Sequence, residues 1–337
     1  MQTRRRQFLR LATGGAALQA FALAAATAAL QAFAPAASAQ SYPAKPVRVL
    51  VGFAAGGTQD IVARLVAQWL SDRTAQQFVV DNRPGAAGNI AADAAIHAPP
   101  DGYTLLMVGL SNAVNASLYR RLDFDFIRDI APVAAIARVP GVMVVNPAFP
   151  AVSVTDFIAY ARAHPGGINM GSGGNGAPQH VYGELFKMMA GVTMVHVAYR
   201  GGAPAMADLL AGQLQVIFNP LPETIEYIKA GKLRALAVTT AARSEALPDT
   251  PALGDFLPGF DASSWYGIGA PRNTPGAVID RLNAEINAAL AEPKARARLA
   301  DLGGTVLPGS PADFADLIAR ETEKWARVVK FSGAASD

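Results

Sequence analysis

This 337-residue sequence contains no cysteine and only four histidines. The absence of cysteine excludes disulfide bonds, thiolate metal sites and a cysteine nucleophile. No two of the four histidines are spaced i, i+4, and no carboxylate completes a metal-binding set beside them. We therefore expect no metal ion, and a core large enough to hold the fold without cross-links. The histidines are His97, His164, His180 and His196.

Nucleotide-binding motifs are missing as well. The phosphate-binding pattern Gly-x-x-x-x-Gly-Lys-Ser/Thr does not occur, and the glycine-rich run at residues 171–176 lacks the acidic residue that a dinucleotide fingerprint requires. Lysine and arginine do not cluster among aromatic residues, as they would on a nucleic-acid-binding face. We expect neither a cofactor nor a nucleic acid as partner.

The amino terminus has the composition of an export signal. Arginines at positions 4–6 precede an Ala/Leu-rich run from about residue 11 to 34, and Ala37-Ser38-Ala39 forms a small-x-small cleavage site. The Arg-Arg pair followed by Gln-Phe-Leu-Arg resembles a twin-arginine signal. An uncleaved anchor is the alternative, because the run is nearly long enough to span a bilayer. The internal glycines and glutamines favour a cleavable signal over residues 1–39 and a location in the periplasm.

Removing this signal changes the charge of the chain. It carries four arginines and no acidic residue, so 29 basic residues fall to 25 against 26 acidic ones, a formal net charge of −1. The high isoelectric point of the whole chain therefore comes largely from the signal and does not indicate a polyanionic partner.

Short β-branched runs alternate with helical patterns, which predicts an α/β fold with mainly parallel sheets. A first helix would place Ile61, Leu65 and Trp69 on one face, with Trp69 and Trp325 in the core and Trp265 either in the core or on a cavity wall. We expect strands near residues 47–51, 77–81, 104–108, 168–171, 192–199, 214–218, 234–240 and 265–270. We expect further helices near residues 86–97, 154–163, 178–189, 203–211, 223–229, 275–302 and 311–331. The last one should begin with Ser310 as its N-cap and Pro311 in its first turn.

Three glycine-rich turns each follow a strand and precede a helix, at residues 56–60, 171–176 and 199–203. Glycine allows close approach of a ligand to the backbone, and the free N–H groups of a first helical turn favour an anion. One such turn alone is more often a plain connection. Three of them, divided between the two halves of the chain, predict a cleft that holds one or two carboxylates.

A serine hydrolase is the competing enzyme hypothesis. Gly-Leu-Ser-Asn-Ala at residues 109–113 resembles a nucleophile elbow without its last glycine, so Ser111, or Ser172 in the second turn, could act as nucleophile. No aspartate is clearly placed to orient a histidine. We therefore predict no catalytic residue and no enzymatic activity.

Seven motifs, in order along nearly the whole mature chain, resemble Bug-type solute receptors of tripartite tricarboxylate transporter systems. They are Phe-Ala-Ala-Gly-Gly-Thr-Gln-Asp at 53–60, Asn-Arg-Pro-Gly-Ala-Ala-Gly at 82–88, Pro-Asp-Gly-Tyr-Thr-Leu at 100–105, Gly-Ser-Gly-Gly-Asn-Gly at 171–176, Val-Ala-Tyr-Arg-Gly at 197–201, Leu-Arg-Ala-Leu-Ala-Val-Thr at 233–239 and Trp-Tyr-Gly at 265–267.

This resemblance implies a two-lobe periplasmic binding protein of type II, with the ligand cleft between the lobes and crossings near Val144 and Trp265. Lobe 1 would comprise residues 40–143 and 266–337, and lobe 2 residues 144–265. The implied ligand is a small carboxylate: a di- or tricarboxylate, an amino acid or an aromatic acid. The implied partners are the membrane permease subunits of the transporter, with the receptor itself a monomer. A receptor that signals to a membrane kinase is the alternative role.

Two departures from the family pattern concern the cleft. The family often has proline where Ala54 and Ala55 stand, and aspartate where this chain has Asn219. Loss of that carboxylate would change the group accepted at the far end of the ligand. The predicted ligand-binding residues are Phe53, Gly57, Thr58, Asp60, Ser111, Ser172, Asn175, His180, Tyr199, Arg200 and Asn219.

Overall fold

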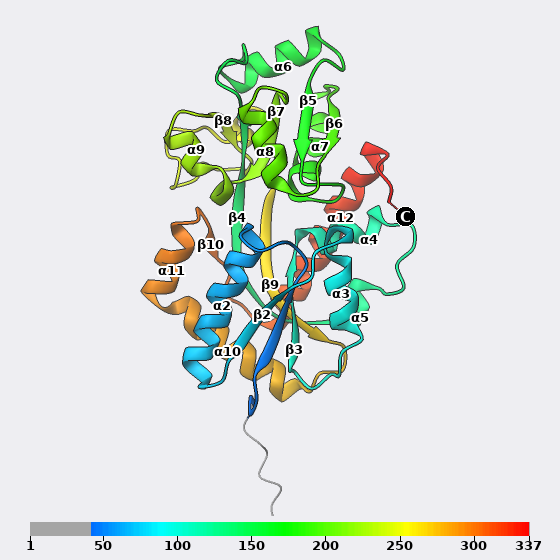
Figure 1. Cartoon of the computed structure of the whole chain (residues 1–337), viewed down its shortest axis with the longest axis vertical. Coiled ribbons are helices and arrows are strands. Elements are labelled where there is room, and N and C mark those ends of the chain that lie inside the picture. The colour runs from blue at the N-terminus through cyan, green and yellow to red at the C-terminus, as the bar shows by residue number, and fades with distance from the viewer. Residues whose placement is uncertain (1–41, 337) are drawn as a thin grey trace, which may run out of the picture. The chain divides into compact units, whose positions relative to one another are not determined.

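The computed structural model describes residues 42–336, so the predicted signal lies outside the described residues. A sheet runs in the order β2-β1-β3-β9-β4-β7-β5-β6, with β8 and β10 also paired to β4 (Figure 1). Its strands are β1 (Val47–Val51), β2 (Phe78–Asn82), β3 (Thr104–Gly109), β4 (Ile130–Val145), β5 (Asn169–Ser172), β6 (Val195–Ala198), β7 (Val216–Pro220), β8 (Arg234–Val238), β9 (Ser263–Pro271) and β10 (Thr305–Val306).

Helices connect and cover these strands, as expected for alternating α/β units. They are α2 (Thr58–Thr74), α3 (Asn89–Ile96), α4 (Leu110–Leu118), α5 (Phe126–Asp129), α6 (Val154–Ala163), α7 (Pro178–Ala190), α8 (Gly202–Leu210), α9 (Ile225–Lys229), α10 (Gly276–Ala291), α11 (Pro293–Ala300) and α12 (Pro311–Ser332). Short 3₁₀ turns are η1 (Ala86–Gly88), η2 (Leu221–Glu223) and η3 (Leu253–Asp255). Among residues 42–336, no helix combines the length and apolar character needed to cross a bilayer.

The long strand β4 divides the sheet into two parts. Residues 130–140 of β4 pair antiparallel with β9, whereas residues 141–145 pair antiparallel with β7. The first part also contains the parallel set β2-β1-β3, and the second part the parallel set β7-β5-β6. In Figure 1, β4 and β9 run together between the two groups of elements. The sheet is therefore mixed rather than mainly parallel, because β4 and β9 return against the parallel strands.

The prediction for α2 was wrong about which face is buried. Val62, Val66 and Leu70 are at most 1% exposed, whereas Trp69 is half-buried beside Arg64 and Gln68, which are exposed. Helix α2 packs on β2 and also contacts α10. Its buried face is therefore shifted by one residue from the face predicted through Ile61, Leu65 and Trp69. Trp325 and Trp265 are fully buried, and both belong to the hydrophobic core.

The carboxyl-terminal region confirms one predicted helix and divides the other. Helix α12 begins with the predicted cap, since the Ser310 hydroxyl accepts the backbone N–H of Asp313 and Pro311 occupies the first turn. The single helix predicted over residues 275–302 is two helices, because Pro293 cannot continue α10 and instead starts α11. Helix α12 packs against both α4 and α7, so it contacts elements of both parts of the sheet.

Candidate functional site

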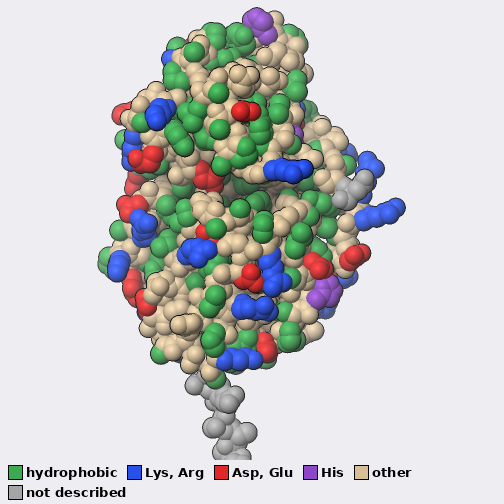
Figure 2. Space-filling model, viewed as in Figure 1, with side chains coloured by type: hydrophobic (Ala, Val, Ile, Leu, Met, Phe, Trp, Pro, Cys, Tyr) green, Lys and Arg blue, Asp and Glu red, His purple; other side chains and the backbone are tan. Residues whose placement is uncertain are grey.

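A cavity of about 590 Å³ lies between the two parts of the sheet. The face drawn in Figure 2 is hollowed there, between the upper and lower groups of elements. The lining comes mainly from turns at the carboxyl ends of strands, the position where open α/β sheets bind ligands. Most lining side chains are apolar or small, and the ionised ones are Arg200 and Glu223. The other polar side chains on the wall are Thr58, Gln59, Ser111, Gln179, Asn219, Tyr227, Ser264 and Tyr266.

The turn between β1 and α2, from Phe53 through Thr58, lines the cavity on the side of the first part of the sheet. Gly56 has a φ of +87°, which favours glycine, whereas Gly57 has a φ of −78° and precedes the helix as its N-cap. A Cβ at Gly57 would lie 3.8 Å from Glu223 Oε1, so the missing side chain leaves room on the cavity side. The first turn of α2 thus presents backbone N–H groups to the cavity, with the helix dipole behind them.

Asp60 orders this turn from outside the cavity. Its carboxylate accepts the backbone N–H of Gly56 at 2.9 Å, Arg64 Nε at 2.9 Å and Asn82 Nδ2 at 2.9 Å. Burial raises the pKa of the Asp60 carboxyl, but these hydrogen bonds outweigh burial and hold the pKa below its usual range. Asp60 does not line the cavity, so in this structure it supports the turn rather than facing a ligand.

A carboxylate from the second part already sits at the amino end of α2. Glu223 Oε1 accepts the Thr58 backbone N–H at 3.1 Å and the Thr58 hydroxyl at 2.9 Å. Glu223 was not among the predicted residues, although it follows β7 and so stands at the carboxyl end of a strand. Burial raises the pKa of the neighbouring Tyr266 well above its usual range, and the Glu223 charge adds to this shift.

Asn219 lines the cavity within a chain of hydrogen bonds. Its Oδ1 accepts Gln179 Nε2 at 2.9 Å, and its Nδ2 donates to Thr224 Oγ1 at 2.7 Å. Thr224 in turn donates to the carbonyl of Pro220 at 3.1 Å, which fixes the donor-to-acceptor direction of all three hydrogen bonds. Gln179 Oε1 is left without a partner among the described residues, and so is Oε1 of Gln59, whose Nε2 donates to the Met107 carbonyl.

The remaining predicted residues divide between the cavity and its surroundings. Arg200 and Ser111 line the cavity, and Ser111 Oγ donates to the Gly176 carbonyl across the two parts at 3.1 Å. Tyr199 lies outside the lining and donates its hydroxyl to Asp208, which raises the pKa of Tyr199 to about 12. Asn175 also lies outside the lining.

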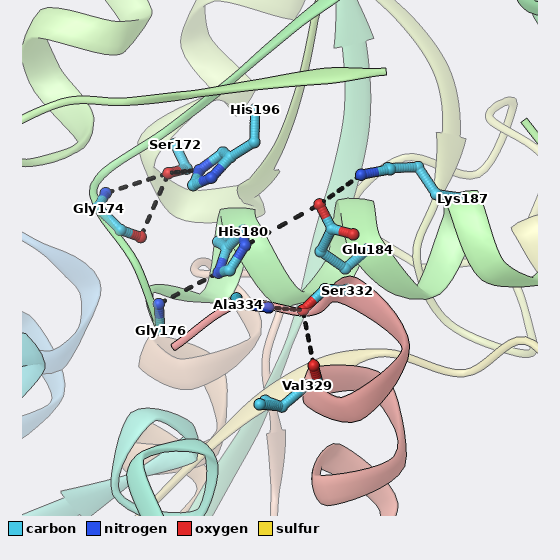
Figure 3. Close-up of polar contacts among 10 residues, drawn as sticks. All are labelled: Ser172, Gly174, Gly176, His180, Glu184, Lys187, His196, Val329, Ser332 and Ala334. Atoms are coloured by element: carbon cyan, nitrogen blue, oxygen red, sulfur yellow. Dashed lines mark hydrogen bonds and ion pairs between the residues drawn. The ribbon is translucent and has the colours of Figure 1, made fainter. Parts of the chain in front are cut away.

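The glycine-rich turn after β5 satisfies its polar groups internally (Figure 3). Ser172 Oγ lies 2.6 Å from His196 Nε2, and the His196 ring stacks on His180 with centroids 4.1 Å apart. His180 Nδ1 accepts the Gly176 backbone N–H at 3.2 Å. Burial, the neighbouring His196 and Lys187 together lower the pKa of His180 to about 3. His180 is therefore neutral near pH 7, and its 3.9 Å approach to Glu184 is not an ion pair.

The Ser172–His196 pair lies away from the cavity wall. Ser172 is completely buried and lies outside the cavity lining, so a substrate cannot reach its hydroxyl. Within residues 42–336, no carboxylate hydrogen-bonds to His196 to orient it. The same residues contain no group of three or more potential metal ligands.

Comparisons with known proteins extend over most of the chain. A family model described as "Tripartite tricarboxylate transporter family receptor" matches residues 62–333. Protein BugT of Bordetella pertussis (strain Tohama I) is 36% identical over 300 residues, covering 88% of this chain and 92% of that protein.

Solved structures give the same picture at the level of the fold. R. palustris Rpa4515 with adipate is 38% identical, with a TM-score of 0.83, and covers 87% of this chain and 99% of its own. MatC (Rpa3494) from Rhodopseudomonas palustris with bound malate is 30% identical, with a TM-score of 0.79, and covers 86% of this chain and 100% of its own.

Proposed function

Because this chain belongs to the tripartite tricarboxylate transporter receptor family, to which the Bug-type receptors belong, we propose that it captures a small carboxylate in the cavity between its two parts. The structures of relatives with adipate and with malate support this assignment by analogy. The observation that carries it is local: the Thr58 N–H and hydroxyl bind a carboxylate oxygen in this structure, that of Glu223. The amino end of α2 therefore has donors that can hold a carboxylate.

The two lobes that we propose follow the sequence boundaries, with lobe 1 at residues 40–143 and 266–337 and lobe 2 at residues 144–265. Strand β4 changes partners at Pro140–Gly141, close to the first boundary, and β9 lies beside it. A ligand that touches both lobes favours the closed arrangement, because it gains contacts that the open arrangement lacks. The closed receptor would then present its ligand to the permease subunits of the transporter.

Ligand contacts are proposed for six of the predicted residues, all of which line the cavity: Phe53, Gly57, Thr58, Ser111, Arg200 and Asn219. The three turns differ in how they contribute. The α2 turn contributes the Thr58 backbone N–H and hydroxyl, which Glu223 occupies in this structure, and Gly201 and Gly202 bring the amino end of α8 to the opposite wall. Arg200 adds the cation on this wall that can pair with a carboxylate.

We further propose that the chain is exported to the periplasm through residues 1–39 and acts there without catalysis. The charge composition and cleavage site of the leader support export. The burial of Ser172, together with the use of the Ser111 hydroxyl by the Gly176 carbonyl, supports a non-catalytic receptor.

A thermal-shift screen of the mature protein tests the function. Mono-, di- and tricarboxylates, amino acids and aromatic acids would be compared with sugars and simple cations, since a ligand raises the melting temperature by mass action. We expect at least one carboxylate to stabilise the protein in a concentration-dependent way, without turnover. A shift with a sugar or a cation and with no carboxylate would contradict the proposal.

A further inference from the structure

Glu223 brings a negative charge to the place where a ligand carboxylate would otherwise bind. It is the last residue of η2, directly after β7, and its side chain reaches across to the first part of the sheet. Oε1 accepts both donors of Thr58, and Oε2 lies 3.3 Å from the position that a Cβ on Gly202 would take. The carboxylate thus lies between the amino ends of α2 and α8, which have 17 and 9 residues.

This internal carboxylate offsets the positive potential that the two helix ends give to the cavity. Each helix amino end carries roughly half an elementary charge, which stabilises one nearby anion. Arg200 and Glu223 are the ionised side chains of the lining, so their formal charges cancel. A free dicarboxylate would bring two negative charges into a wall with no net formal charge.

The amide donor of Gln179, which lies near Glu223, is used elsewhere. Gln179 Nε2 is committed to Asn219 Oδ1, and this direction is fixed by the chain that ends on the Pro220 carbonyl. The Oε1 atoms of Gln179 and Gln59 have no partner among the described residues, and both side chains line the cavity. Both Oε1 atoms are themselves shielded from solvent, so the selection of the ligand rests on the charge of Glu223 rather than on these acceptors.

We propose that Glu223 determines ligand specificity, selecting acids with a single carboxylate, including those with a hydroxyl or ammonium group at the far end, over dicarboxylates. The inference rests on the proposed carboxylate-binding function. It narrows the ligand class, because Glu223 places a negative charge on the same wall as Asn219. A monocarboxylate can pair its single acid group with Arg200, whereas the second acid group of a dicarboxylate would have to displace Glu223 from Thr58 or accept like-charge repulsion beside it.

Calorimetric titration with chain-length-matched acids tests this specificity. Hexanoate, adipate and 6-aminohexanoate share six carbons, and shorter matched sets would be used if the cavity prefers them. At about pH 7.5 both carboxyl groups of a dicarboxylate are ionised. In the wild type we expect the monocarboxylates to bind at least roughly tenfold more tightly than the dicarboxylate, about 1.4 kcal/mol.

The variant Glu223→Gln keeps the shape and an acceptor for Thr58 while removing the charge. We expect it to shift the ratio of the two Kd values toward the dicarboxylate by roughly tenfold or more. Glu226→Gln is the matched control, because Glu226 is an exposed glutamate three residues away that pairs with Lys229. It removes the same charge outside the cavity and should leave the ratio unchanged. Melting curves of both variants confirm that they fold.

The outcomes separate this inference from the function on which it rests. Carboxylate binding with an unchanged ratio in Glu223→Gln, an equal shift in Glu226→Gln, or a wild type that prefers the dicarboxylate would each overturn the specificity role alone. Failure of every acid to bind the wild type and Glu223→Gln, with a non-acid ligand binding instead, would overturn both.

Discussion

Two glycine-rich turns of similar composition serve different ends in this molecule. The turn before α2 leaves its first helical N–H groups open to the cavity, where one of them meets the carboxylate of Glu223. The turn after β5 reaches the cavity at Gly173, but its polar groups are closed by neighbouring side chains: Ser172 meets His196, and the Gly176 N–H is taken by His180. A glycine-rich βα turn therefore becomes an anion site only where neighbouring side chains leave its donors free.

The same comparison explains why polar residues in the two turns differ in role. Asp60 supports the open turn from behind, accepting the Gly56 N–H while the cavity side stays clear. In the closed turn, the rings of His180 and His196 stack on each other, and each ring contacts a polar group of the turn. Three predictions, from the largest expected effect to the smallest, test this distinction.

Gly57→Val should nearly abolish binding through the open turn. The new Cβ would point toward Glu223 Oε1, and its two methyl groups would occupy the space in front of the first turn of α2. We expect carboxylate affinity to fall by roughly a hundredfold, about 2.7 kcal/mol, with the melting temperature of the unliganded protein nearly unchanged. Gly276→Val, at the exposed start of α10, is the control. A carboxylate affinity of Gly57→Val close to that of the wild type would show that the open turn is not part of the binding site.

The buried histidine of the closed turn should make the free energy of unfolding depend on pH. Burial, the first cause, holds the pKa of folded His180 at about 3 against 6.5 for an ordinary histidine, so between these values the unfolded chain binds more protons. The free energy of unfolding should therefore fall as pH is lowered below about 6.5, by up to about 1.4 kcal/mol per pH unit from this residue. Lys187, Glu184 and His196 are the charged or titratable neighbours.

Urea unfolding at a series of pH values between about 7 and 4.5 measures this slope. His180→Asn keeps an acceptor for the Gly176 N–H while removing one titrating group. It should reduce the slope, and the remainder comes from His196, whose pKa is lowered to about 4 by burial. His164→Asn, which replaces an exposed histidine, should not reduce the slope. Equal slopes in the wild type and in His180→Asn would show that the fold does not lower the pKa of His180.

Ser172→Ala should have the smallest effect. The hydroxyl is buried and meets only His196 and the Gly174 backbone, so its removal should cost about 1 kcal/mol of stability. Carboxylate binding should stay within roughly twofold of the wild type, since Ser172 does not line the cavity. Titration calorimetry with the best acid from the screen would check this. A large loss of affinity would place Ser172 in the ligand site after all.

Local sequence patterns were sufficient for many individual elements. Helix α6 occupies the predicted residues 154–163, and the capping serine and proline at 310–311 start α12 as expected. The family resemblance predicted from seven motifs is confirmed by the family match and by BugT, and the two-lobe α/β fold is confirmed by the solved relatives. These features depend on short-range chemistry or on motifs that can be read residue by residue.

Long-range features escaped the same analysis. Strand β4 was not predicted, because its 16 residues include Pro132, Pro140 and Gly141 and pair with partners far along the chain. The parallel character of the sheet was overestimated for the same reason. Asp60, Ser172, Asn175, His180 and Tyr199 stay untested as ligand contacts, although the structure places them outside the cavity lining.

The sequence by itself determined the family, the alternating elements and the positions of the glycine-rich turns, and the leader over residues 1–39 stays a prediction. Only the tertiary structure decided which turn opens into the cavity and which closes on a histidine pair. It also brought Glu223 to Thr58, across 165 residues of chain. The physical reason is that turn composition and helix periodicity are local. Whether a donor remains free depends on side chains that arrive from elsewhere in the packed fold.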